Sequence, residues 1–206
     1  MAEKNRYVSK EELIVLNSFT EADLRILKQH EDIKSVNIWL EGLAIPNLDF
    51  LLNCMQLESV SMYGGKVGDY SALGKLPKLK SIFLNGRLRR WTENLDFLRE
   101  LRTLESLMIL NYPMISCFPD LHNLVNLINV EIWDCKRLVD IAAVTLIPNL
   151  QTFVFVGTSL NADDLEFIAK KPGIKTMGGM LGSNRKNDAF KSMLKKYGIE
   201  NVWREG

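Results

Sequence analysis

The feature that most constrains the fold is a short apolar pattern that returns along most of the chain. The segment LKSIFL, from Leu79 to Leu84, has apolar residues at its first, fourth and sixth positions, and the pattern recurs every 22 to 25 residues. The first residues of the copies are Ile33, Leu57, Leu79, Leu104, Leu127, Leu150 and Ile174, the last of them opening the weakened copy IKTMGG. A fixed period of this length indicates a repeat architecture in which each copy is one supersecondary unit.

Each copy is followed by a second apolar set at helical or near-helical spacing. These residues are Leu48 and Leu51, Leu73 and Leu76, Leu95, Leu98 and Leu101, Leu121 and Leu124, Ile141 and Val144, and Leu165 and Ile168. Strand and helical turn therefore alternate once per repeat. Because so small a unit cannot bury its apolar face alone, successive units must stack and share one core, which predicts a right-handed solenoid.

The repeats resemble those of the leucine-rich repeat family over about residues 10 to 180. The segments VGDYSALGKLPKL and LVDIAAVTLIPNL are most similar to the internalin and phosphatase-regulator type, in which Asp between apolar residues follows the strand. The resemblance implies an α/β leucine-rich repeat solenoid of about seven to eight repeats. It also implies a parallel concave sheet, short helices or 3-10 turns on the convex side, and helical caps. The eighth copy is EELIVL, where Leu13 and Val15 take the second and third apolar places.

One position departs from the family pattern. The family usually has Asn eight residues after the first Leu of a repeat, where its amide bonds backbone between turns. The corresponding residues here are Glu41, Gly65, Arg87, Tyr112, Cys135 and Thr158. Since only Cys135 and Thr158 are familiar substitutes, we expect irregular turns.

The ends of the chain indicate caps on a single domain spanning residues 1–206. Residues 1–32 are interpreted as an N-terminal capping repeat, 33–180 as leucine-rich repeats, and 181–206 as a C-terminal capping helix and strand. TEADLRILKQHEDI resembles NADDLEFIAKKPGI, and each begins a helix at Thr or Asn followed by acidic residues. In the last segment, an apolar helical face that ends near Gly198 is formed by Phe190, Met193, Leu194 and Tyr197.

The strand residues between the core positions must line the concave sheet, because alternate residues of a strand face opposite sides. Two after each first residue, the side chains are small and polar: Ser35, Ser59, Ser81, Ser106, Asn129, Thr152 and Thr176. The positions four and six after each first residue hold the predicted partner-binding residues. These are Asn37, Trp39, Ser61, Tyr63, Phe83, Asn85, Met108, Leu110, Glu131, Trp133 and Val154. Phe83 is expected to be solvent-exposed in the free protein. Exposed aromatic residues of this kind are enriched in protein interfaces, although stacking between strands is the alternative role.

Catalysis has little support in the sequence, so the chain is interpreted as non-enzymatic and without a cofactor. His30 and His122 lie in no recognisable constellation, and the cysteines, at positions 54, 117 and 135, lack metal-ligand spacing. No zinc-protease, nucleophile-elbow or phosphate-loop motif occurs. We interpret His122 as a satisfied surface histidine.

A basic cluster in NGRLRRW gives an alternative partner. Arg87, Arg89 and Arg90 share one segment and could contact phosphate, which makes nucleic-acid binding a lesser alternative. Nearby acidic residues, such as Glu93 and Asp96, oppose this reading, as does a net charge of +1 for the whole chain.

The expected partner is therefore another protein, captured on the concave face. The chain has no predicted signal peptide or membrane span, and its odd number of spaced cysteines fits a reducing compartment, so a cytoplasmic location is expected. A monomer is favoured. Two roles remain open: a small inhibitor or immunity-type protein, and a regulatory or scaffold subunit of a larger complex.

Overall fold

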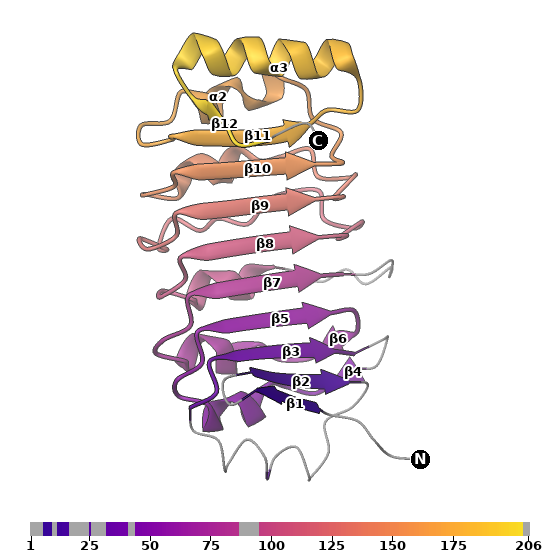
Figure 1. Ribbon diagram of the computed structural model, residues 1–206, viewed down its shortest axis with the longest axis vertical. Helices are drawn as coiled ribbons and strands as arrows, with labels where there is room; N and C mark the ends of the chain where they lie inside the picture. The colour runs from indigo at the N-terminus through magenta and orange to yellow at the C-terminus, as the bar shows by residue number, and fades with distance from the viewer. Residues whose placement is uncertain are drawn as a thin grey trace.

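The sheet of this protein is built from strands that follow one another in sequence order. The computed structural model describes residues 6–9, 12–16, 25, 32–40, 44–86 and 95–203. Within these ranges, the strand order of the main sheet is β1-β2-β3-β5-β7-β8-β9-β10-β11-β12 (Figure 1). The strands are β1 Arg6–Ser9, β2 Glu12–Leu16, β3 Ser35–Trp39, β5 Ser59–Tyr63, β7 Ser81–Asn85, β8 Ser106–Leu110, β9 Asn129–Trp133, β10 Thr152–Val156, β11 Thr176–Met180 and β12 Glu200–Asn201.

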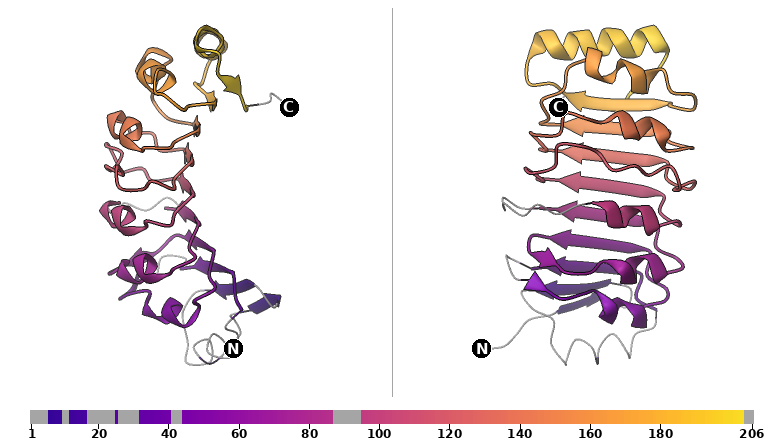
Figure 2. Two further views of the ribbon diagram at one scale, coloured as in Figure 1. Left: turned by 90° about the vertical axis from the view of Figure 1, so that its left-hand side faces the viewer. Right: turned by 180° about the vertical axis from the view of Figure 1, so that it is seen from behind.

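Helical turns occupy the opposite side of the stack. They are the 3-10 helices η1 Asp49–Asn53, η2 Ser71–Lys75, η3 Asp96–Glu100, η4 Ala142–Leu146 and η5 Asp163–Leu165, and the α-helices α2 Glu166–Ala169 and α3 Asn184–Tyr197. A minor sheet pairs β4 (Ala44–Ile45) with β6 (Lys66–Val67). Seen edge-on, the stack curves, with the main sheet on the concave side and the helical turns on the convex side (Figure 2). This is the architecture expected for a leucine-rich repeat solenoid.

The strands from β3 to β11 pair in parallel and in one constant register. Ser35 lies opposite Ser59, Ser59 opposite Ser81, and Ser81 opposite Ser106. Along β3, β5, β7, β8 and β9, partly exposed and buried residues alternate, as the L-x-x-L-x-L pattern predicts. The predicted assignment of the two strand faces is therefore confirmed for these five strands.

The second apolar set of each repeat fills the convex half of the core. Both residues of each pair are buried, as in Leu48 and Leu51 or Ile141 and Val144. The repeat after β8 differs, because Leu121 and Leu124 lie in turns rather than in a helix. There the chain forms an isolated parallel bridge between Cys117 and Asp140.

Three side-chain hydrogen bonds between repeats lie on the side of the stack where the chain enters each strand. Just before the strand pattern begins, Asn126 Nδ2 donates to the Arg102 carbonyl at 2.9 Å, and Asn149 Nδ2 donates to the Val125 carbonyl at 2.7 Å. One repeat earlier, the Thr103 hydroxyl donates to the Leu79 carbonyl at 2.6 Å. These bonds satisfy backbone carbonyls of the preceding repeat.

The two ends of the sheet are built differently. β2 pairs in parallel with β3, where EELIVL predicts a further strand, and β1 then adds an antiparallel edge that the repeat pattern does not predict. The predicted helix in TEADLRILKQHEDI lies almost entirely outside the described residues.

At the C-terminal end, the predicted helix is confirmed. Ser183 accepts a hydrogen bond from the Lys186 amide at the start of α3, and Gly198 ends the helix with φ of 65°. Phe190, Met193 and Leu194 are buried against the last repeat.

A charged cluster joins α2 to α3. Glu166 accepts hydrogen bonds from Lys196 Nζ at 2.7 Å and from the Tyr197 hydroxyl at 2.5 Å, and it pairs with Lys170 at 3.4 Å. The bonds from Lys196, Tyr197 and Lys170 lower the pKa of Glu166 from 4.5 to about 2. The carboxylate is therefore ionised over the whole neutral and mildly acidic range.

Candidate protein-binding surface

The concave face presents three parallel rows of side chains, one from each outward position of the strands. Neighbouring strands lie about 4.8 Å apart, so the row from Trp39 to Trp133 crosses four strand spacings, or roughly 19 Å. In the described strands from β3 to β9, Glu131 is the one charged residue at these outward positions. The face is therefore largely uncharged.

Three aromatic rings form one continuous cluster over β3, β5 and β7, which we call the aromatic cluster. Trp39 and Tyr63 stack with ring centroids 3.8 Å apart and planes 3° from parallel. Phe83 meets Tyr63 edge-on, with centroids 5.2 Å apart and planes at 67°. The edge-on pair has a geometry that aromatic rings prefer.

The cluster explains why a phenylalanine lies on the side of β7 away from the core. All three rings are partly buried rather than fully exposed. The expectation that Phe83 is solvent-exposed in the free protein therefore holds only in part, because the edge of Tyr63 covers some of its ring. Stacking between strands and an accessible apolar surface coexist in this cluster.

A polar network surrounds Trp133 in β9, an aromatic residue of the concave face that lies outside the aromatic cluster. Trp133 Nε1 donates to Glu131 Oε2 at 3.1 Å, and Asn129 Nδ2 donates to Glu131 Oε1 at 3.3 Å. Asn129 Nδ2 also lies 3.1 Å from Ser106 Oγ on the neighbouring strand. Both carboxylate oxygens of Glu131 are thus engaged, and the indole of Trp133 is held in one orientation.

Val154 is the predicted binding residue that the structure removes from the accessible surface. It is 7% exposed, whereas its neighbours in the same row, such as Glu131, are partly exposed. The prediction that Val154 lies open on the concave face is therefore wrong.

The C-terminal residues lie over the neighbouring strands at this end of the face. Val202 donates its amide to the Met177 carbonyl, and the ring of Trp203 lies 5.6 Å from that of Trp133. The repeat pattern does not predict which residues make this contact.

The other predicted partner-binding residues share the concave face as expected. Those that are partly exposed are Asn37, Trp39, Ser61, Tyr63, Phe83, Asn85, Met108, Leu110, Glu131 and Trp133. The small polar row beside them is also partly exposed, and Thr152 and Thr176 join their hydroxyls at 2.8 Å. All eleven predicted side chains thus share one face, and ten of them are partly exposed.

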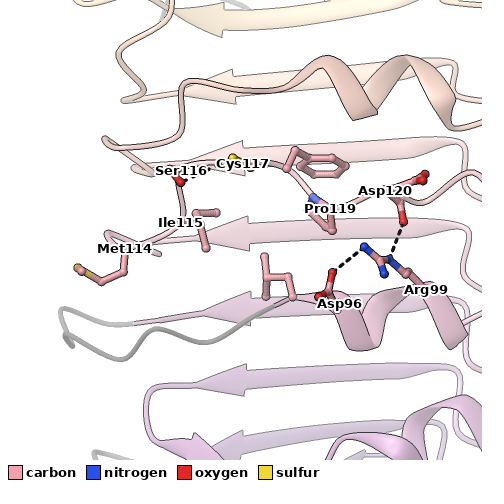
Figure 3. A pocket seen from close by; sticks show the side chains of 10 residues that line it. Asp96, Arg99, Met114, Ile115, Ser116, Cys117, Pro119 and Asp120 are labelled. Carbon is pink, nitrogen blue, oxygen red and sulfur yellow. Dashed lines mark hydrogen bonds and ion pairs between the residues drawn. The ribbon is translucent and has the colours of Figure 1, made fainter.

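A separate cavity of about 400 Å³ opens near η3, on the side of the stack away from the sheet (Figure 3). Its wall includes Arg99, which binds Asp96 at 2.8 Å and the Asp120 carbonyl at 3.2 Å. Asp120 accepts hydrogen bonds from the amide and ring of His122, which lower the pKa of its carboxyl group. His122 is therefore a satisfied surface histidine, as predicted.

The three cysteines differ in access to solvent. Cys117 lines this cavity and is exposed, whereas Cys54 and Cys135 are buried. Burial raises the pKa of each of these two thiols to about 11. All three are free thiols.

The predicted basic cluster of Arg87, Arg89 and Arg90 lies outside the described residues. Over the ranges that are described, no group of three or more His, Cys, Asp or Glu side chains is placed to hold a metal ion. In the same ranges, no helix has both the length and the apolar character to cross a membrane.

The chain has a distant likeness to a solved internalin. No protein-family model and no curated protein sequence matches it. It is similar to the crystal structure of internalin C2 from Listeria monocytogenes, with a TM-score of 0.43 and 14% sequence identity. The match covers 84% of this chain and 80% of that one. The assignment of the fold rests instead on the repeat period and the strand register.

Proposed function

We propose that this protein is a non-catalytic binding module that captures another protein on its concave face. The observation that carries the proposal is the aromatic cluster, formed by Trp39, Tyr63 and Phe83. Its rings lie on the face opposite the apolar core and keep part of their surface open to solvent. Tryptophan and tyrosine are the residues most enriched among interface hot spots, and apolar surface patches commonly mark interaction sites.

The proposed footprint extends from the aromatic cluster toward β9. Met108 and Leu110 continue the apolar surface on β8, and Asn37, Ser61 and Asn85 supply polar groups at its margin. This pattern of large apolar residues beside polar ones fits a protein interface. The outward positions of the described strands β3, β5, β7 and β8 carry no charged residue, which favours a partner whose contacting surface is also uncharged.

The proposed organisation is one domain with repeats between two caps. Residues 33–180 form the repeats, and the buried face of α3 together with β12 supports residues 181–206 as the C-terminal cap. β1 and β2 support an N-terminal cap within residues 1–32, most of which lie outside the described ranges.

Two roles are compatible with such a module, an inhibitor or immunity-type protein and a regulatory or scaffold subunit. We favour the inhibitor role and propose a cytoplasmic location. A one-to-one complex in which the partner loses its activity would support inhibition, whereas a complex that keeps its activity would support the scaffold role.

The proposal is tested by capturing partners with the immobilised protein and identifying them by mass spectrometry. Phe83→Ala and Trp39→Ala should each abolish capture of the true partner. Phe167→Ala is the matched control, because Phe167 is 38% exposed on α2, away from the sheet. Capture that survives both sheet variants and fails with the Phe167 variant would place the binding site on the convex side.

A further inference from the structure

The concave face already holds one occupant, the C-terminal segment of the chain itself. β12 pairs in parallel with β11 through Glu200 and Asn201, opposite Thr176 and Met177. The segment then turns over the sheet, and the C-terminal end of the ribbon projects on its concave side (Figure 2). We call residues Glu200–Trp203 the tail.

Gly178 provides the space into which the tail fits. It lies in the same row as Val154 and Glu131, so its missing side chain faces the concave side. A Cβ atom at this position would lie 2.8 Å from Val202 Cγ2 and 3.3 Å from the Trp203 amide nitrogen. A side chain at position 178 would therefore require the Val202 side chain and the backbone at Trp203 to shift.

Trp203 extends across the sheet from β11 to β9. Its backbone lies over Gly178 in β11, while its ring is 5.6 Å from that of Trp133 in β9, at 55° between the planes. Val154, on the strand between them, is 7% exposed. The tail thus covers one end of the face and leaves the aromatic cluster on β3, β5 and β7 uncovered by it.

We propose that the tail is an intramolecular ligand, and that the partner places an extended segment bearing a tryptophan in the same site. The inference rests on the proposed function, since it names the chemistry of the partner that the concave face takes. The site combines a ring surface on Trp133 with a glycine that admits backbone close to the sheet. Together these features select an aromatic side chain carried by an extended chain. The tail limits access to this end of the face until it is displaced.

A thiol at position 154 reports whether the site is covered. The full chain carries Val154→Cys, with Cys117→Ser to remove the exposed native thiol, and labelling by a disulfide reagent is followed by absorbance. Trp203→Ala should raise the labelling rate by about tenfold or more, because protection by a local contact is lost when that contact is removed. Trp203→Phe, which keeps a ring, should retain most of the protection. An unchanged rate in Trp203→Ala would show that Trp203 is not the cover.

A synthetic peptide tests the chemistry of the partner. The probe is the blocked pentapeptide Ile-Glu-Asn-Val-Trp, which copies residues 199–203. At millimolar concentration it should slow labelling of the Trp203→Ala chain and leave the rate unchanged where Trp203 is present. The same peptide with Ala in place of Trp should give no protection.

Two outcomes would overturn the proposed partner chemistry. Equal protection by both peptides would mean that the ring is not recognised, and protection by neither would mean that the site accepts only its own tail. Neither outcome affects the proposed function, which is tested by capture through Phe83 and Trp39 without any change to the tail.

Discussion

Replacing Phe83 by Ala tests the assignment of the two sheet faces, because the matched residue Phe155 faces the core. Phe155 is 0% exposed and meets Phe190 of α3 edge-on, with ring centroids 5.2 Å apart. Truncating a buried phenylalanine costs about 3–5 kcal/mol, which is the loss of unfolding free energy expected for Phe155→Ala. Phe83 is partly buried and has its edge contact with Tyr63. We expect Phe83→Ala to cost about 1–2 kcal/mol, mostly from that ring pair and the partial burial.

Urea denaturation followed by circular dichroism measures both variants against the parent protein. Affinity for the captured partner should fall by about 2 kcal/mol or more in Phe83→Ala if the residue is a hot spot. Equal destabilisation by the two variants would refute the reasoning, since it would mean that Phe83 is packed as deeply as a core residue. Normal affinity in a stable Phe83→Ala variant would instead remove Phe83 from the binding site.

Three further predictions concern other parts of the molecule. Glu166→Gln should destabilise the protein at neutral pH, where the carboxylate of the parent is ionised in both the folded and the unfolded state. The difference should shrink as pH falls from about 4.5 to about 2, because the unfolded chain then binds a proton that the folded protein does not; melting curves across that range measure it, and a difference independent of pH would contradict it. A maleimide should react rapidly with one thiol per native chain, and Cys117→Ser should abolish that reaction, whereas rapid labelling of a second thiol would contradict the burial of the other two. Asn126→Ala and Asn149→Ala should each lower the unfolding free energy by about 1 kcal/mol, through loss of the bond to the preceding repeat; urea curves that superimpose on the parent curve would show that these bonds contribute nothing.

The period and the alternation within each strand are sufficient to predict the repeats and the faces of their strands. A shift of one residue would exchange the two faces, so the apolar pattern fixes the register strongly. For this reason Ile82 and Leu84 are correctly placed in the core and Phe83 on the opposite side. The stacking of Trp39 on Tyr63 is not predictable in the same way, because it depends on the side-chain conformations of both residues.

The burial of Val154 is not predictable from its place in the repeat. That place shows which face of the sheet the side chain is on, but not whether a distant segment covers it. Its cover is provided by residues nearly fifty positions later, with no periodic relation to β10. A signal was nevertheless present in the weakened repeat, where Gly178 replaces a side chain in the row. The inter-repeat bonds of Thr103, Asn126 and Asn149 also had a readable signal, since each residue immediately precedes a repeat.

The contact between Trp203 and Trp133 has a consequence for how the molecule unfolds. In a stack of repeats, each unit is stabilised mainly by its nearest neighbours, so unfolding can begin at an end and proceed one unit at a time. Trp203 instead joins the C-terminal edge of the sheet to β9, past the intervening strand β10. Fraying from the C-terminus must therefore break this contact, which no pairing between neighbouring strands supplies, before β12 can leave the sheet.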